Sequence, residues 1–195
     1  MYIQWKAAVD KGSGVASYIV EARIGTGAFR RVATTKRQFA HVRLNGSGAY
    51  QFRVIAVDRN GNRSKPITIP GRVRRTLLQE SDPSIAYRGS WKTVSSPGAF
   101  GGKVRRASVK GATVTVSFTG RELAWISPTS RSYGTAQVKA DGHKLRGVSL
   151  YRAAAARRIV HVWTWTKDAR HRVAITVDGS NRHPRIDVDA FVVIR

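Results

Sequence analysis

Three residues of this chain have the side-chain types that proteins use to hold sugars. Trp163 lies in a segment of alternating residues, and Tyr133 and Arg131 lie in the loop-like segment 129–134. An exposed aromatic ring can stack on the C–H face of a pyranose, and a guanidinium can clamp a pair of hydroxyls or a carboxylate. We therefore predict Trp163, Tyr133 and Arg131 as carbohydrate-binding residues.

Each aromatic residue also has a structural interpretation. Trp163 shares its strand face with His161 and Trp165, so packing of these rings in a core or between sheets remains open. Tyr133 can equally be a loop anchor with a buried ring. A groove at the loop end lined by Trp163 or Tyr133 would favour binding, whereas burial of both side chains would favour a purely structural module.

Residue patterns for catalysis are missing. The sequence has no cysteine, no His-Glu-x-x-His motif, no Gly-x-Ser-x-Gly elbow and no histidines at metal-ligand spacing. Glycoside hydrolysis needs at least one pair of carboxylates. Asp187 and Asp189 share a strand face, but hydrogen bonding to neighbouring strand ends explains them better. We predict no enzyme, no catalytic residues and no metal ligands fixed by a motif.

The charge of the chain is extreme. It carries 35 basic and 11 acidic side chains, a formal net charge of +24. Such a field attracts nucleic acid and anionic cell-wall polymers without sequence specificity. The excess is arginine-rich and spread over both halves, which is typical of a biased genome composition and disfavours a dedicated nucleic-acid binder. Electrostatic binding of a polyanion stays open as an alternative.

Alternating apolar residues and glycine-rich turns predict an all-β protein. In the first part of the chain, predicted strands span residues 3–5, 15–22, 29–34, 39–44 and 50–57. Strands of this length and spacing predict a β-sandwich.

The first module resembles a fibronectin type III domain. Residues 12–18 resemble the B–C loop and C strand of bacterial members, residues 58–62 resemble the F–G turn, and Leu44 with Tyr50 fits the tyrosine corner. The resemblance implies that residues 1–70 form a spacer β-sandwich whose strand A, before Trp5, is missing. Both a longer parent chain and a short protein that starts here remain open.

A second module is expected at residues 79–195, after a linker at 71–78 that follows the break at Pro70. Predicted strands there span 112–120, 121–126, 134–142, 145–150, 159–165, 171–177 and 186–194. The segments 87–91, 118–120, 141–142 and 187–191 resemble those of galactose-binding-like jelly rolls in bacterial carbohydrate-binding modules. The resemblance implies a β jelly-roll sandwich, commonest in exported proteins of GC-rich bacteria such as actinobacteria.

These resemblances imply a non-catalytic extracellular or cell-surface module, the tail of a larger secreted protein, that binds a polysaccharide or a cell-wall polymer. Purely structural spacer domains of an adhesin are the alternative. Many jelly rolls of this kind hold a structural calcium ion, for which Glu80, Asp82 and Asp189 are the candidate ligands. No apolar segment is long enough to span a membrane and no signal peptide opens the chain, so we expect no membrane insertion and a monomer.

Overall fold

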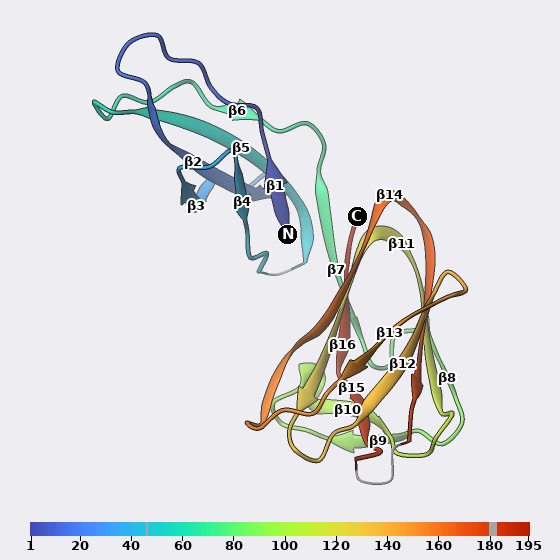
Figure 1. Ribbon diagram of the computed structural model, residues 1–195. Coiled ribbons are helices and arrows are strands. Elements are labelled where there is room, and N and C mark those ends of the chain that lie inside the picture. Colours follow the sequence, from blue (N-terminus) through green and yellow to red (C-terminus); the bar gives the residue numbers. More distant parts are fainter. Residues whose placement is uncertain (46, 180–182) are drawn as a thin grey trace. The chain divides into compact units, whose positions relative to one another are not determined.

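The chain is all-β, as predicted (Figure 1). The computed structural model describes residues 1–45, 47–179 and 183–195, and it divides into two compact units, Met1–Arg75 and Thr76–Arg195. Within the described ranges the one helical element is the short 3-10 turn η1 (Phe100–Gly102), and no helix there is long and apolar enough to cross a membrane.

The first unit contains two sheets. One pairs β1 with β4, and the other has the order β3-β2-β5, with β6 and the first part of β7 also paired to β5. The strands are β1 (Tyr2–Gln4), β2 (Val15–Ile24), β3 (Arg30–Thr35), β4 (Phe39–His41), β5 (Gly48–Asp58), β6 (Ile67–Thr68) and β7 (Val73–Gln79). Alternation buries one face of β2 and β5, including Val20, Ala22, Tyr50 and Phe52.

Strand β7 carries the chain from the first unit into the second. Residues 73–78, which the sequence analysis treats as linker, are therefore strand rather than coil. Val73 lies opposite Tyr50 of β5 and is buried, and Leu78 belongs to the core of the second unit. The physical reason is that burial of an apolar side chain is favourable, and each end of this short connection carries one that packs into a different unit.

The second unit is a β-sandwich. A three-stranded sheet has the order β15-β10-β9, and the larger sheet has the order β13-β12-β14-β11-β16, with β8 also paired to β11. Its strands are β8 (Ile85–Arg88), β9 (Lys92–Ser95), β10 (Lys103–Ala107), β11 (Thr113–Thr129), β12 (Thr135–Ala140), β13 (His143–Ser149), β14 (Ala156–Val177), β15 (Ile186–Val188) and β16 (Ala190–Ile194). The core cluster contains Trp125, Phe191, Leu123 and Ile175.

Two predicted pairs of strands are each one long strand, so those boundaries were wrong. Residues 112–120 and 121–126 form parts of β11, and residues 159–165 and 171–177 form parts of β14. The two strands pair along their whole length, with irregularities at Gly120/Glu122 and Trp125/Ile126. Gly120 lies within β11 instead of ending it. Glycine is required there because a Cβ would lie 2.7 Å from the backbone oxygen of Ile194.

The Asp141-Gly142 turn was predicted correctly. Both residues have positive φ, 50° and 84°, as a tight two-residue hairpin requires, and the turn joins β12 to β13. The Asp141 carboxylate accepts hydrogen bonds from the Trp165 indole and from the Arg172 backbone N–H, each at 2.8 Å. It also lies 2.8 Å from His171 Nδ1. These contacts fix the hairpin against β14.

The last predicted strand, 186–194, is split at Asp189. Strand β15 pairs with β10 in the smaller sheet, whereas β16 pairs with β11 in the larger one. The chain therefore passes from one sheet to the other within a single residue. Asp187 and Asp189, on either side of Val188, are both without solvent exposure.

Candidate functional site

Two short strands bring an arginine and an aspartate together inside the second unit. Arg106 of β10 lies directly opposite Asp187 of β15, and directly opposed residues of an antiparallel pair share one face of the sheet. The turn that follows β11 reaches the same place, because Tyr133 forms an isolated bridge with Arg185 just before β15. Strand pairing thus assembles groups that are up to 81 residues apart in the chain.

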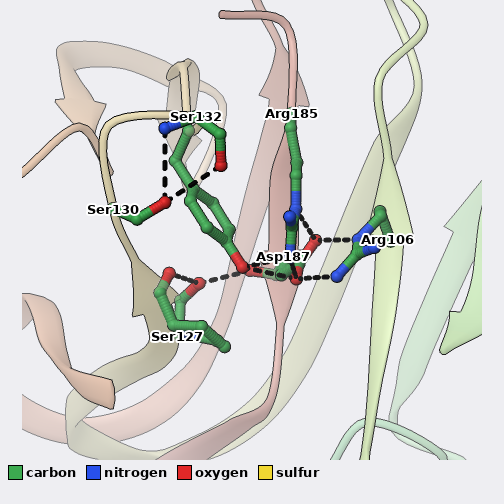
Figure 2. Close-up of polar contacts among 8 residues, drawn as sticks. Arg106, Ser127, Ser130, Ser132, Arg185 and Asp187 are labelled. Carbon is green, nitrogen blue, oxygen red and sulfur yellow. Dashed lines mark hydrogen bonds and ion pairs between the residues drawn. The ribbon is translucent and has the colours of Figure 1, made fainter. Parts of the chain in front are cut away.

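Asp187 is the centre of this arrangement (Figure 2). Its Oδ1 accepts from Arg106 Nε at 2.9 Å and its Oδ2 from Arg106 Nη2 at 3.0 Å. Arg185 Nη2 donates to Oδ2 at 2.7 Å and Arg185 Nε to Oδ1 at 3.2 Å. Burial alone would raise the pKa of Asp187, but the hydrogen bonds from the two guanidinium groups more than offset it, so the pKa lies below its ordinary value.

Tyr133 completes the network. Its hydroxyl donates to Asp187 Oδ2 at 2.8 Å and accepts from Arg185 Nη2, while the Arg185 guanidinium lies 4.1 Å from the ring centroid. Burial, followed by the charge of Asp187, raises the pKa of the phenol well above its usual range. The phenol therefore stays protonated and remains a fixed hydrogen-bond donor at physiological pH.

The backbone beside Tyr133 explains why the turn lies here. Gly134 N–H donates to the carbonyl of Arg185 at 2.8 Å, and a Cβ at position 134 would fall 1.8 Å from the carbonyl oxygen of His183. Only glycine permits this approach of the two chain segments. The glycine therefore sets the position of Tyr133 against Arg185.

A groove of about 400 Å³ lies beside the network. Its lining contains two guanidinium groups, Arg157 and Arg185, and no acidic side chain. The lining residues are Ser96, Gly98, Pro128, Thr129, Ser130, Tyr133, Ala155, Ala156, Arg157 and Arg185. Hydroxyls and guanidinium N–H groups next to short apolar side chains can hydrogen-bond a polyhydroxylated molecule.

The three residues predicted from sequence do not form one site. Tyr133 lines the groove but is only 4% exposed, and its hydroxyl is already used by Asp187 and Arg185. Arg131 is exposed in the same turn and is not among the groove-lining residues. The expected role of Tyr133 as a stacking platform does not agree with its burial, and its place in the structure is that of an anchor.

Trp163 lies elsewhere, and its ring is buried. The side chain is 6% exposed, belongs to the core cluster, and packs at 4.7 Å between ring centroids against His161. Trp163 lies opposite Leu123, whose side chain is fully buried, so the strand face that carries Trp163 is the core face at this point. Packing in the core, the alternative interpretation, fits the structure.

Sequence reasoning did not single out Arg106, Arg157 or Arg185. In a chain with 35 basic residues no local pattern distinguishes these three from the others. The usable signal was Asp187, because an aspartate in an apolar strand must be buried and a buried carboxylate requires cationic or hydrogen-bonding partners. That signal predicts that partners exist and does not identify them.

The resemblance to galactose-binding-like jelly rolls suggests a structural calcium ion, with Glu80, Asp82 and Asp189 as candidate ligands. Asp82 is occupied in a turn, where Oδ1 accepts from the Ser84 N–H at 2.9 Å and from the Ser84 hydroxyl at 2.5 Å. Across the described residues, no group of three or more His, Cys, Asp or Glu side chains is arranged to hold a metal ion. Asp82 therefore does not fit the predicted set.

Glu80 and Asp189 are the two remaining candidate ligands. Both are buried, and Glu80 Oε2 and Asp189 Oδ2 have no hydrogen-bond partner. The other oxygen of Asp189 accepts from Phe100 N–H at 2.8 Å, and Arg157 Nη1 lies 3.5 Å from Oδ2. Burial, with a further contribution from the Glu80 charge, raises the pKa of Asp189. Ca²⁺ prefers carboxylate and carbonyl oxygens as ligands, so Glu80 and Asp189 are the part of the predicted set that is not already used in a turn.

Comparison with known proteins finds likeness over part of the chain. No family model matches. The chain is 25% identical over 114 residues to an A type blood N-acetyl-alpha-D-galactosamine deacetylase of Flavonifractor plautii, a match that covers 58% of this chain and 14% of that protein. It is 29% identical over 108 residues to the A type blood alpha-D-galactosamine galactosaminidase of the same organism, covering 55% of this chain and 10% of that protein. The chain thus spans only a small part of each relative.

Three solved structures with a similar fold are distant in sequence. A family two carbohydrate esterase from Cellvibrio japonicus has 18% identity and a TM-score of 0.48, covering 63% of this chain and 34% of that one. A family 35 carbohydrate binding module from Clostridium thermocellum has 9% identity and a TM-score of 0.46, covering 61% and 97%. The CBM36-1 domain of a xylanase from a Trinervitermes trinervoides hindgut metagenome has 13% identity and a TM-score of 0.44, covering 62% and 96%.

Proposed function

We propose that the second unit is a non-catalytic module that binds carbohydrate in the groove beside Tyr133. The observation that carries the proposal is the pre-organised edge of this groove. Arg185 is held by Asp187 and Tyr133, and Arg157 lies over the Phe100 ring at 4.3 Å. Polar groups that are fixed before a ligand arrives lose little conformational entropy on binding. The protein is extracellular in this proposal.

The chemistry of the groove favours hydroxyl-rich ligands. Arg157 and Arg185 offer N–H donors, Ser130 offers a hydroxyl, and Ala155 and Ala156 offer small apolar contacts. Both curated relatives carry names that refer to α-linked galactosamine or its N-acetyl form, although each match covers at most 14% of the relative. Glycans that end in these sugars are therefore the first ligands to test.

The first unit serves as a spacer of the fibronectin type III kind. Two features support this part of the proposal. The Tyr50 hydroxyl donates to the carbonyl of Asn45 a few residues upstream, which is the contact of a tyrosine corner. The two sheets β1-β4 and β3-β2-β5 are the two layers that a sandwich of this kind requires.

A structural cation between Glu80 and Asp189 belongs to the same proposal. Ca²⁺ prefers carboxylate and carbonyl oxygens, and both residues present a buried carboxylate oxygen that has no hydrogen-bond partner; the one of Asp189 lies 3.5 Å from Arg157 Nη1. When bound, the ion would supply charge compensation between the first and last strands of the second unit. Its role is stability of the sandwich that positions the groove.

A purely structural role is the second candidate, and one observation favours it. Trp163 and Tyr133 are both buried, so neither ring offers an open face to a pyranose. Under this alternative the second unit extends a surface protein and the groove has no ligand. The two candidates differ in a single measurable property, the retention of the protein on glycans.

The test compares two neighbouring arginines of β14. Arg157→Gln removes a groove donor, whereas the next residue, Arg158, points from the opposite face of the strand and is not a lining residue. The full chain is applied to a glycan array that includes N-acetyl-α-D-galactosamine-terminated glycans. We expect retention of the native chain and of R158Q, and a loss of about tenfold for R157Q and S130A, equal to one lost hydrogen bond of about 1.4 kcal/mol.

Two results would oppose carbohydrate binding in the groove. The absence of retention of the native chain on every glycan and polysaccharide would support the structural alternative. Equal losses for R157Q and R158Q would mean that retention depends on overall charge. Thermal unfolding of each variant separates a binding defect from a folding defect.

A further inference from the structure

The outer face of the β3-β2-β5 sheet in the first unit carries a row of basic side chains. Arg31 of β3 and Arg53 of β5 lie on either side of Glu21 in β2, as direct cross-strand partners. Arg23 lies two residues further along β2 and opposite Gln51. Alternation places these side chains on one face, because Val20, Ala22 and Phe52, the intervening residues, form the core.

The same face continues onto β7. Arg74 lies opposite Ala49 of β5, and Ala49 is two residues from Gln51, so Arg74 is on the outer face. We define Arg23, Arg31, Arg53 and Arg74 as the arginine face. Strands lie about 4.8 Å apart and alternate residues about 6.7 Å apart, so the four positions form a compact two-dimensional array.

Two of these arginines are held rigidly. Arg23 donates from Nε at 2.9 Å and from Nη2 at 2.6 Å to the Gln51 side-chain oxygen, and Arg53 Nε forms an ion pair with Glu21 at 2.5 Å. Both guanidinium groups also lie over the ring of Phe29, at 4.7 Å and 4.3 Å from its centroid. The stack fixes the direction in which the remaining N–H groups point.

The charge of the face is not compensated. Glu21 is the one acid among the cross-strand positions described above, and it is already paired with Arg53. Arg31 and Arg74 are exposed and form no ion pair with any described residue. The first unit as a whole has 15 basic and 3 acidic side chains between residues 1 and 75. Charge complementarity therefore requires an anionic partner.

We propose that the arginine face binds the phosphodiester backbone of a linear polymer, independently of any base or sugar attached to it. A guanidinium group can donate two parallel hydrogen bonds to the two non-bridging oxygens of one phosphate. A compact array of guanidinium groups can therefore contact several closely spaced phosphates. The Phe29 ring is covered by Arg23 and Arg53, so it does not offer a stacking surface for a nucleobase. This site is in a different unit from the proposed sugar groove and stands without it.

The experiment uses the full chain and two probes that share only the backbone chemistry, oligo(dT) and poly(glycerol phosphate). Binding is measured as a function of salt concentration by fluorescence anisotropy, with the second polymer as a competitor. We compare the double variant R31Q/R74Q with the control R121Q/R146Q, which removes the same charge from exposed arginines of the second unit. Among the described residues, no side-chain hydrogen bond or ion pair involves Arg31, Arg74, Arg121 or Arg146, so both variants should fold.

We expect both polymers to bind. Each phosphate contact on a single strand contributes about 0.7 to the slope of log K against log salt, so R31Q/R74Q should lower the slope by about 1.4 while the control leaves it unchanged. Equal effects of the two variants would overturn the proposal, because binding would then depend on net charge alone. Binding of oligo(dT) without competition by poly(glycerol phosphate) would also overturn it, since a base would then be recognised.

Discussion

Replacement of Asp187 by asparagine is the sharpest test of how the second unit is held together. The change keeps the shape of the side chain and removes the charge that compensates Arg106 and Arg185. Removal of one partner from a buried ion pair costs about 3–5 kcal/mol. The two arginine side chains are 30% and 27% exposed, so water compensates part of this loss and we expect the lower end, about 3 kcal/mol.

The assay is equilibrium and thermal unfolding of the full chain followed by tryptophan fluorescence. Four of the five tryptophans are in the second unit, so the signal reports mainly on that unit. A loss of 3 kcal/mol corresponds to a fall in Tm of about 10 °C for a unit of this size. The control is Asp168→Asn, because Asp168 is 42% exposed and pairs with Arg195 at 3.5 Å, a surface contact worth about 0–1 kcal/mol.

One result would refute the reasoning. If D187N and D168N lower the stability by the same amount, the buried network contributes no more than a surface ion pair. If D187N does not fold, Tyr133→Phe gives a milder version of the test, because it removes only the hydroxyl that contacts Asp187 and Arg185. We expect Y133F to cost about 1.5–3 kcal/mol, the value of a hydrogen bond to a charged group.

Three further predictions concern the same unit. The folded-state pKa of Asp187 is below its ordinary 3.8, so its contribution is complete above pH 3.8 and is lost as the pH falls through the folded pKa; acid titration of stability should show this loss in the native chain and not in D187N. The folded-state pKa of Asp189 is raised, so ionisation of Asp189 costs stability above that pKa, and Asp189→Asn should remove the cost at neutral pH. Ca²⁺ should raise the Tm of the native chain but not of D189N. Equal shifts of the two Tm values would contradict a cation between Glu80 and Asp189. Gly134→Ala should lower the Tm by more than 10 °C, because its Cβ would meet the His183 carbonyl oxygen at 1.8 Å, and an unchanged Tm would show that the turn can move.

Local patterns predicted most of the strands. The segments 15–22, 50–57 and 171–177 lie inside β2, β5 and β14, because alternation of apolar residues is written in the sequence and needs no knowledge of the partner strand. The Asp141-Gly142 hairpin was equally local, since few residue pairs adopt positive φ at both positions. Whether a long strand ends at a glycine could not be predicted from the local sequence. Gly120 was read as a strand end, yet the partner strand β14 continues past it and keeps β11 intact.

The candidate site was only partly accessible from sequence. Tyr133 was singled out for its residue type and does line the groove, but its burial depends on Arg185, which lies 52 residues later in the chain. Trp163 has the residue type of a sugar platform and the position of a core residue. Which face of a strand points inward is set by the sheet that packs on it, and alternation alone does not give this direction.

The sequence by itself determined the alternation that gives an all-β chain, the charge of +24 and the aromatic and arginine residues that were candidates for a sugar site. Tertiary structure alone decided which of these residues meet. Of the 35 basic residues, Arg106 and Arg185 contact Asp187 because Arg106 is its cross-strand partner and Arg185 lies two residues before it. Trp163 is in the core, opposite the buried Leu123 of β11. The physical reason is that hydrogen bonds and packing act over a few ångströms in space, whereas the partners they join are separated by up to 81 residues in the chain.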